Sequence, residues 1–110
     1  MSTDVLARIK QEVSQNPVVL YMKGTPDFPQ CGFSYRVAEI LNQFDISYHA
    51  VDVLSDQAVR EGIKVFGQWP TIPQLYISGE LIGGCDIVCQ MNDAGTLLPI
   101  IQQAVQISGE

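Results

Sequence analysis

At residues 23–34 the chain reads Lys23-Gly24-Thr25-Pro26-Asp27-Phe28-Pro29-Gln30-Cys31-Gly32-Phe33-Ser34. An apolar run precedes this segment at 18–22, and an amphipathic run follows it from about Tyr35. The pattern predicts a strand, a loop stiffened by two prolines, and a helix whose first turn carries Cys31. A thiol there faces unpaired N–H groups and the positive end of the helix dipole, which favour the thiolate. We interpret Cys31 as a working thiol; the alternative is an inert, buried cysteine.

The residue three positions after Cys31 limits the chemistry of this thiol. A Cys-x-x-Cys pair could close its own disulfide, but Ser34 stands at the second position. Its hydroxyl can cap the helix or hydrogen-bond a thiolate, yet it cannot carry electrons. Redox or metal chemistry at Cys31 must therefore use a second sulfur from elsewhere.

The composition limits the class of protein. With 110 residues, 46% of them hydrophobic, we expect one compact domain over residues 1–110. The net charge is −6 and the basic residues form no stripe, which argues against nucleic-acid binding. No apolar run approaches the ~20 residues of a membrane span, and the N-terminus resembles neither a signal nor a transit peptide. Three cysteines, an odd number without zinc-ribbon spacing, favour a reducing, cytoplasmic setting.

Periodicity along the chain predicts alternating helices and strands. Strands are expected at 18–22, 48–53, 74–77 and 81–82, with a tight turn at Ser78-Gly79 and a break at Gly83-Gly84. The first helix is expected from a cap among residues 2–4 to Asn16, and the second around 35–44. The third is expected from Ser55 or Asp56 to Gly67. A short helix is expected from a cap at Asp86 through Met91, and the last helix from Thr96 onward. This order predicts an α/β, thioredoxin-like fold, with a four-stranded mixed sheet flanked by helices on both faces.

Several sequence blocks occur together in a fixed order and spacing. They are Lys23-Gly24-Thr25-Pro26, Cys31-Gly32-Phe33-Ser34, Arg60, Trp69-Pro70-Thr71-Ile72-Pro73 and Gly83-Gly84-Cys85-Asp86-Ile87. In these blocks the chain resembles the monothiol, CGFS-type glutaredoxins, from about residue 17 to the last helix. The resemblance implies a glutathione groove lined by Lys23, Arg60, Thr71, Ile72, Pro73, Gly84, Cys85 and Asp86, with Cys31 as the nucleophile and metal ligand.

Physical chemistry gives most of these residues a reason to line such a groove. Lys23 and Arg60 suit the glycine carboxylate of glutathione, although each could be a solvated surface charge. The resemblance implies a cis peptide bond before Pro73, so that the Ile72 backbone pairs with an extended peptide. Thr71 would support this turn, or be a plain loop threonine.

The second half of the groove is expected at the start of a helix. Backbone N–H groups at Cys85-Asp86 suit the glutamyl carboxylate, and Asp86 suits the ammonium group, unless it only caps the helix. Ile72 departs from the aromatic residue common in the family, which changes the apolar wall. Cys85 could pack, or form a disulfide with Cys31 under oxidation. Cys89 is outside the family pattern, and we expect it to be structural.

The resemblance implies that the chain carries an iron–sulfur cluster. A 2Fe-2S cluster commonly takes four thiolates. One subunit offers Cys31 and a bound glutathione offers a second thiolate, so two subunits supply four. We therefore expect a homodimer when the cluster is bound and a monomer without it, cluster transfer to apoproteins, and pairing with BolA-like proteins.

Two other functions use the same groove. The first is glutathione-dependent thiol–disulfide exchange, in which Cys31 attacks a glutathionylated protein and free glutathione regenerates the thiol. The second is a binding or regulatory adaptor without catalysis. The site residues do not separate these functions from cluster transfer.

Overall fold

The structure is a computed structural model that describes residues 3–107. Ser2, one of the caps expected for the first helix, lies outside these residues. The helices are α1 (Thr3–Gln15), α2 (Gly32–Asn42), α3 (Gln57–Gly67), α4 (Cys85–Ala94) and α5 (Leu97–Ile107), with a short 3₁₀ turn, η1, at Val53–Ser55. The strands are β1 (Val18–Met22), β2 (His49–Asp52), β3 (Gln74–Ile77) and β4 (Glu80–Gly83).

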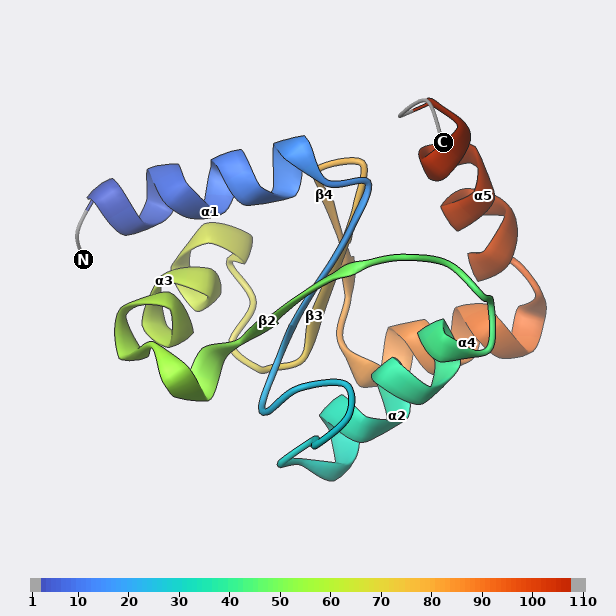
Figure 1. Cartoon of the computed structure of the whole chain (residues 1–110), viewed down its shortest axis with the longest axis horizontal. Coiled ribbons are helices and arrows are strands. Elements are labelled where there is room, and N and C mark those ends of the chain that lie inside the picture. Colours follow the sequence, from blue (N-terminus) through green and yellow to red (C-terminus); the bar gives the residue numbers. More distant parts are fainter. Residues whose placement is uncertain (1–2, 108–110) are drawn as a thin grey trace.

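The strands form one mixed sheet in the order β2-β1-β3-β4 (Figure 1). Strand β1 runs parallel to β2 and antiparallel to β3, and β4 returns antiparallel to β3. Leu20 lies opposite Ala50 on one side and Leu75 on the other. This arrangement confirms the thioredoxin-like fold expected from the order of helices and strands.

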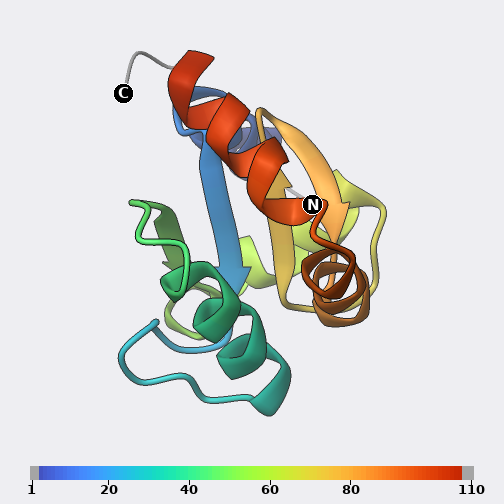
Figure 2. The same ribbon diagram turned by 90° about the vertical axis from the view of Figure 1, so that its right-hand side faces the viewer.

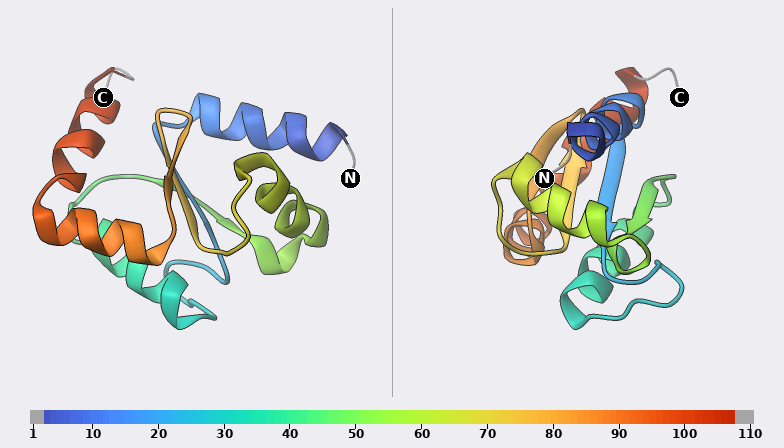
Figure 3. Two further views of the ribbon diagram at one scale, coloured as in Figure 1. Left: turned by 180° about the vertical axis from the view of Figure 1, so that it is seen from behind. Right: turned by 90° about the vertical axis from the view of Figure 1, so that its left-hand side faces the viewer.

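Helices cover both faces of the sheet, as the sequence predicts. Helices α2, α4 and α5 lie over one face (Figure 2), and α1 and α3 lie over the other (Figure 3). Every residue of β1 is buried because alternate side chains enter different cores. Val18, Leu20 and Met22 join the core beneath α2, α4 and α5, while Val19 and Tyr21 join the core beneath α1 and α3. The unbroken apolar run of β1 follows from this double burial.

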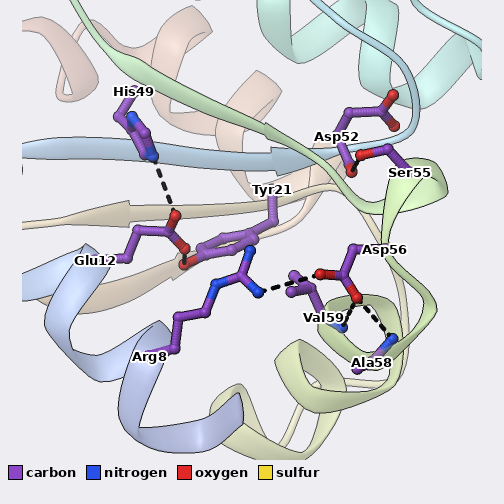
Figure 4. A network of polar contacts seen from close by, with 9 residues as sticks. All are labelled: Arg8, Glu12, Tyr21, His49, Asp52, Ser55, Asp56, Ala58 and Val59. Carbon is purple, nitrogen blue, oxygen red and sulfur yellow. Dashed lines mark hydrogen bonds and ion pairs between the residues drawn. The ribbon is translucent and has the colours of Figure 1, made fainter. Parts of the chain in front are cut away.

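Helix boundaries confirm some expected caps and correct others. Asp56 caps α3, since its side chain accepts hydrogen bonds from the Ala58 and Val59 N–H groups (Figure 4). The cap expected at Asp86 is wrong: α4 already begins at Cys85, with Gly84 as the N-cap, so Asp86 lies inside the first turn. The helix also extends to Ala94 rather than ending near Met91.

Two glycines end their elements where the sequence predicted it. Helix α3 ends at Gly67, and Gln68 follows as its left-handed C-cap, with φ 49°. A side chain at Gly67 would collide with the Tyr76 hydroxyl and the Gln74 side chain, so glycine is also needed here for close packing. Gly83 ends β4, with φ 149°.

A polar network ties α1 to the sheet (Figure 4). The buried Tyr21 hydroxyl donates to Glu12 Oε1 at 2.6 Å, and Glu12 Oε2 lies 3.2 Å from His49 Nε2. Burial, followed by the hydrogen bond to the Glu12 carboxylate, raises the pKa of Tyr21. The phenol therefore stays a neutral donor, and Glu12 on α1 connects β1 with β2.

Replacing Tyr21 tests this connection. Tyr21→Phe keeps the ring in the core but removes the donor to a partly buried carboxylate, which should lower the free energy of unfolding by about 1.5–3 kcal/mol. Urea denaturation would measure the loss as a lower midpoint with an unchanged slope. The control is Tyr35→Phe, whose exposed hydroxyl donates to Glu39, and it should change stability by less than about 0.5 kcal/mol. Equal losses in the two variants would contradict the assignment.

Candidate functional site

A groove of about 480 Å³ opens at one end of the sheet. Because β1 and β3 are antiparallel with Tyr21 opposite Gln74, the residues after β1 and those before β3 meet at this end. The starts of α2 and α4 and one side chain of α3 complete the walls. The residues that line the groove are Lys23, Cys31, Phe33, Lys64, Trp69, Pro70, Thr71, Ile72, Pro73, Gly84, Cys85, Asp86 and Ile87.

Cys31 is the N-cap of α2, one position before the first helical residue. Its backbone is extended, and its carbonyl oxygen accepts the Tyr35 N–H at 2.9 Å. Partial burial opposes ionisation, but hydrogen bonds from the backbone N–H groups of Ser34 and Phe33 and the charge of Lys23 outweigh it. The pKa of the Cys31 thiol therefore lies below its ordinary value. The structure thus places an activated thiol at the groove.

Ser34 connects the Cys31 segment to the end of β1. Its hydroxyl is buried and accepts the Lys23 N–H at 3.0 Å, and Ser34 also helps to lower the pKa of the Cys31 thiol. The intervening loop is closed by the Gln30 N–H, which donates to the Lys23 carbonyl at 2.9 Å, and is anchored by Asp52 Oδ1, which accepts the Gly24 N–H. Lys23 and Cys31 are therefore held at opposite ends of a braced loop.

The loop before β3 forms the opposite wall. Its Ile72-Pro73 bond is cis, as the resemblance implied, and Ile72 is buried. The buried side chain of Gln74 braces this loop, since its Nε2 donates to the carbonyls of Trp69 and Thr71 at 3.1 and 3.2 Å. The Tyr76 hydroxyl satisfies Gln74 Oε1 at 2.9 Å. Sequence reasoning missed Gln74, although a polar residue opening an otherwise apolar strand was a usable signal.

Two cations on α3 differ in their position. Arg60, expected from sequence to bind the glycine carboxylate, is not among the residues that line the groove, whereas Lys64 is. Lys64 lies one turn further along the same helix face, with its Nζ 3.4 Å from Glu61 Oε2. The i,i+4 spacing from Arg60 could have identified Lys64. The other residues expected to bind glutathione all line the groove.

The start of α4 forms the third side of the groove. Gly84 is the N-cap, and a side chain there would come within 3.2 Å of the Pro73 carbonyl oxygen and 3.3 Å of Trp69 Nε1. Glycine therefore lets the start of α4 approach the loop with the cis bond. Asp86 is exposed in the first turn, next to backbone N–H groups without helical partners.

Cys85 lines the groove, and its Sγ lies 3.9 Å from the Sγ of Cys89. Burial, followed by the neighbouring Cys89, raises the pKa of Cys85 to about 11. Within residues 3–107, no group of three or more His, Cys, Asp or Glu side chains is arranged to hold a metal ion. None of the described helices combines the length and the hydropathy that a membrane crossing requires.

Comparison with known proteins defines the family. A family model described as Glutaredoxin matches residues 18–82. Over 96 residues the chain is 49% identical to Monothiol glutaredoxin-S11 of Oryza sativa, and over 105 residues it is 44% identical to Monothiol glutaredoxin-S7, chloroplastic, of the same plant. These matches cover 87% and 96% of this chain, which spans only 20% and 62% of the lengths of the two relatives. The chain belongs to the monothiol glutaredoxins.

Further relatives match this glutaredoxin over nearly its whole length. It is 42% identical over 106 residues to Glutaredoxin 4 of Haemophilus ducreyi, which covers 96% of this chain and 99% of that protein. The solution structure of reduced poplar apo GrxS14 is 42% identical, with a TM-score of 0.78 over 90% of this chain and 91% of that one. The crystal structure of a buckwheat glutaredoxin–glutathione complex is 26% identical, with a TM-score of 0.82 over 93% and 91% of the two chains.

The charge of Lys23 provides a test of the site. Because the Lys23 cation lowers the pKa of Cys31, Lys23→Gln should raise that pKa and move the reaction of Cys31 with iodoacetamide to higher pH. The rate of alkylation against pH would be followed in a Cys85→Ser, Cys89→Ser background, in which Cys31 is the remaining cysteine. Lys10→Gln on α1, on the other face of the sheet, is the control and should leave the profile in place. A profile unmoved by Lys23→Gln would contradict the electrostatic role.

Proposed function

We propose that this glutaredoxin binds glutathione in the groove and carries a 2Fe-2S cluster as cargo between two subunits, for transfer to apoproteins. The observation that carries the proposal is Cys31, an activated thiol at the N-cap of α2, with Ser34 where a second thiol would close a disulfide. Such a thiolate is free to bind iron together with a thiolate that the groove supplies.

The groove has the chemistry that glutathione requires. Glutathione is a short peptide with two carboxylates, one ammonium group and a thiol. Lys23 and Lys64 line the groove as cations for the glycine carboxylate, and Arg60 lies one turn from Lys64 as a third. The backbone of Ile72 can pair with the extended peptide. The buckwheat glutaredoxin, whose solved structure is a complex with glutathione, shares the fold around these positions.

The start of α4 suits the other end of glutathione. Its unpaired backbone N–H groups can bind the glutamyl carboxylate, and the exposed Asp86 can bind the ammonium group. Thr71 and Pro73 shape the wall between the two ends, and Gly84, which carries no side chain, lets the start of α4 lie close to the Pro73 carbonyl oxygen and Trp69. With its ends held in this way, the central cysteine of glutathione lies toward Cys31.

The surface around Cys31 suits a partner. Phe28, Phe33 and Tyr35 are 73%, 63% and 53% exposed, so three exposed aromatic side chains lie close to Cys31 in the sequence, and Phe33 lines the groove with it. Such a surface is typical of protein interfaces. We propose that it contacts a second subunit when the cluster is bound, that the protein without a cluster is a monomer, and that a BolA-like protein or a client apoprotein can replace one subunit.

Glutathione-dependent thiol–disulfide exchange is the second candidate function. The lowered pKa of Cys31 favours it, since the thiolate attacks disulfides. In this reaction Cys31 takes the glutathionyl group from a protein and releases that protein as a thiol, and free glutathione then regenerates Cys31 and leaves as glutathione disulfide. Both functions suit a reducing, cytoplasmic setting, in which the three cysteines of the chain remain free thiols.

Cysteine variants test cluster binding. Cys31→Ser should abolish cluster assembly, because Cys31 is the only thiol of the chain at the start of α2. Cys89→Ser should leave assembly nearly intact, since Cys89 packs against the core instead of lining the groove. Both would be reconstituted anaerobically with glutathione and compared by visible absorption and by elution volume. Equal loss of colour in the two variants would refute the role of Cys31.

Charge reversal tests glutathione binding. Lys64→Glu and Arg60→Glu each remove one partner of a charge-assisted contact, which should weaken glutathione binding roughly ten- to a hundredfold. Isothermal titration calorimetry on the protein without a cluster would measure the affinity. Lys10→Glu makes the same change of charge on α1 and should have little effect. If neither α3 variant differs from that control, α3 does not bind the carboxylate.

A further inference from the structure

Two thiols meet near the start of α4. Cys85 is the first residue of this helix, and Cys89 follows one turn later on the same face, with 3.9 Å between the two sulfur atoms. Cys85 lines the groove, whereas Cys89 packs against the core beneath α2, α4 and α5. The pair therefore has one sulfur at the groove and one directly behind it.

The separation of the two sulfur atoms fits a shared metal ion. Thiolate–metal bonds of ~2.3 Å, the length found for zinc, place two sulfurs on one ion ~3.8 Å apart at the tetrahedral angle and at most ~4.6 Å apart in a linear arrangement. The observed 3.9 Å lies within this range. A disulfide would need the sulfurs at about 2.05 Å. An ion can therefore lie between them while the helix stays intact.

The charges around the pair favour a cation between the sulfurs. Burial, followed by the neighbouring Cys89, raises the pKa of the Cys85 thiol to about 11, because two thiolates so close together repel each other. A positive ion between the sulfurs attracts both of them and removes this repulsion. Arg36 on α2, which packs against α4, acts in the same direction, since its charge lowers the pKa of Cys85.

The number of ligands selects the kind of metal. In the part of the chain that the structure describes, no third His, Cys, Asp or Glu side chain completes a metal site with the pair. Zinc takes three or four protein ligands, so two cysteines are too few for it. Cu(I) is a soft ion that thiolates select, and it is stable at low coordination numbers. Its complex with two thiolates has a net negative charge, which the nearby guanidinium of Arg36 offsets.

We propose that Cys85 and Cys89 bind one Cu(I) ion between their sulfur atoms. The ion replaces the thiol protons, which pass to water, and neither copper nor sulfur changes its oxidation state. Because Cys85 lines the groove, a thiol that enters the groove can reach the ion and exchange with a protein ligand. The site goes beyond the function proposed above, since it uses neither Cys31 nor a bound glutathione.

The test uses a variant that contains only this pair. The chain has three cysteines, so Cys31→Ser leaves two, Cys85 and Cys89. The reduced full-length variant would be titrated without oxygen against the coloured Cu(I) complex of bicinchoninate, and one ion per chain should leave the chelator. The matched Cys31→Ser, Cys89→Ser variant should bind Cu(I) roughly a hundredfold or more weakly, because a second ligand on the same chain acts at a high effective concentration. Equal affinities in the two variants would overturn the proposal.

Alkylation provides a second measurement that needs only the Cys31→Ser variant. One equivalent of Cu(I) should protect Cys85 and Cys89 together from N-ethylmaleimide, as measured by intact mass and peptide mapping, and the elution volume should stay that of the metal-free variant. Protection of a single cysteine, or elution as a larger species in which two chains share the ion, would overturn the proposal. Tight binding by the wild-type protein that is lost in Cys31→Ser would also overturn it, because the ion would then belong to Cys31.

Discussion

The antiparallel pairing of β1 with β3 is the interaction on which the groove depends. Tyr21 lies opposite Gln74, so the chain leaves β1 at the same end of the sheet at which it enters β3. The Cys31 loop follows β1 directly, and the loop with the cis bond before Pro73 precedes β3. Burial of β1 on both faces fixes this register, because a slip of one residue would exchange the side chains that enter the two cores.

Side chains at the ends of these strands convert this pairing into a defined site. Gln74 holds the loop before β3 through two carbonyl oxygens, and Ser34 holds the start of α2 against the Lys23 N–H. Both side chains are fully buried, so their hydrogen bonds are made where water does not compete. The groove is therefore braced on both walls by polar groups that do not themselves line it, which is what a preorganised binding site needs.

Sequence patterns predicted the helices and strands well because these elements depend mainly on residues that are close together in the chain. The apolar run of β1 and the Asp56 cap of α3 depend on neighbouring residues only, and both were predictable. Asp86 was misassigned as a cap because the start of α4 is set by Gly84, whose lack of a side chain permits close packing on Pro73. The close packing at Gly67 was not predicted for the same reason, since the groups that exclude a side chain there come from β3. Contacts across the fold are not visible in local spacing.

In the candidate site, too, local sequence predicted some features, whereas others depend on contacts across the fold. The resemblance identified Cys31, whose activation depends largely on its own helix, but the i,i+4 spacing of Arg60 and Lys64 does not show which of the two lines the groove. The i,i+4 spacing of Cys85 and Cys89 was readable in the sequence, yet only the folded structure shows that Cys85 lines the groove and Cys89 does not. Sequence therefore indicates which residues can react, and packing decides which of them meet.

The proposed carrier role follows from which groups would hold the cluster and how firmly the chain holds those groups. The core contains none of the groups assigned to the cluster, so folding does not depend on the metal. In the proposed cluster-bound dimer, half of the four thiolates belong to glutathione, which the groove would hold by charge and backbone contacts, so cluster retention would depend on free glutathione by mass action. A second protein thiol at Ser34 would replace one of these exchangeable ligands with a fixed one, or would close a disulfide with Cys31. In the proposed carrier, a serine at that position would keep the cluster weakly held, and a client with several cysteines could then take it.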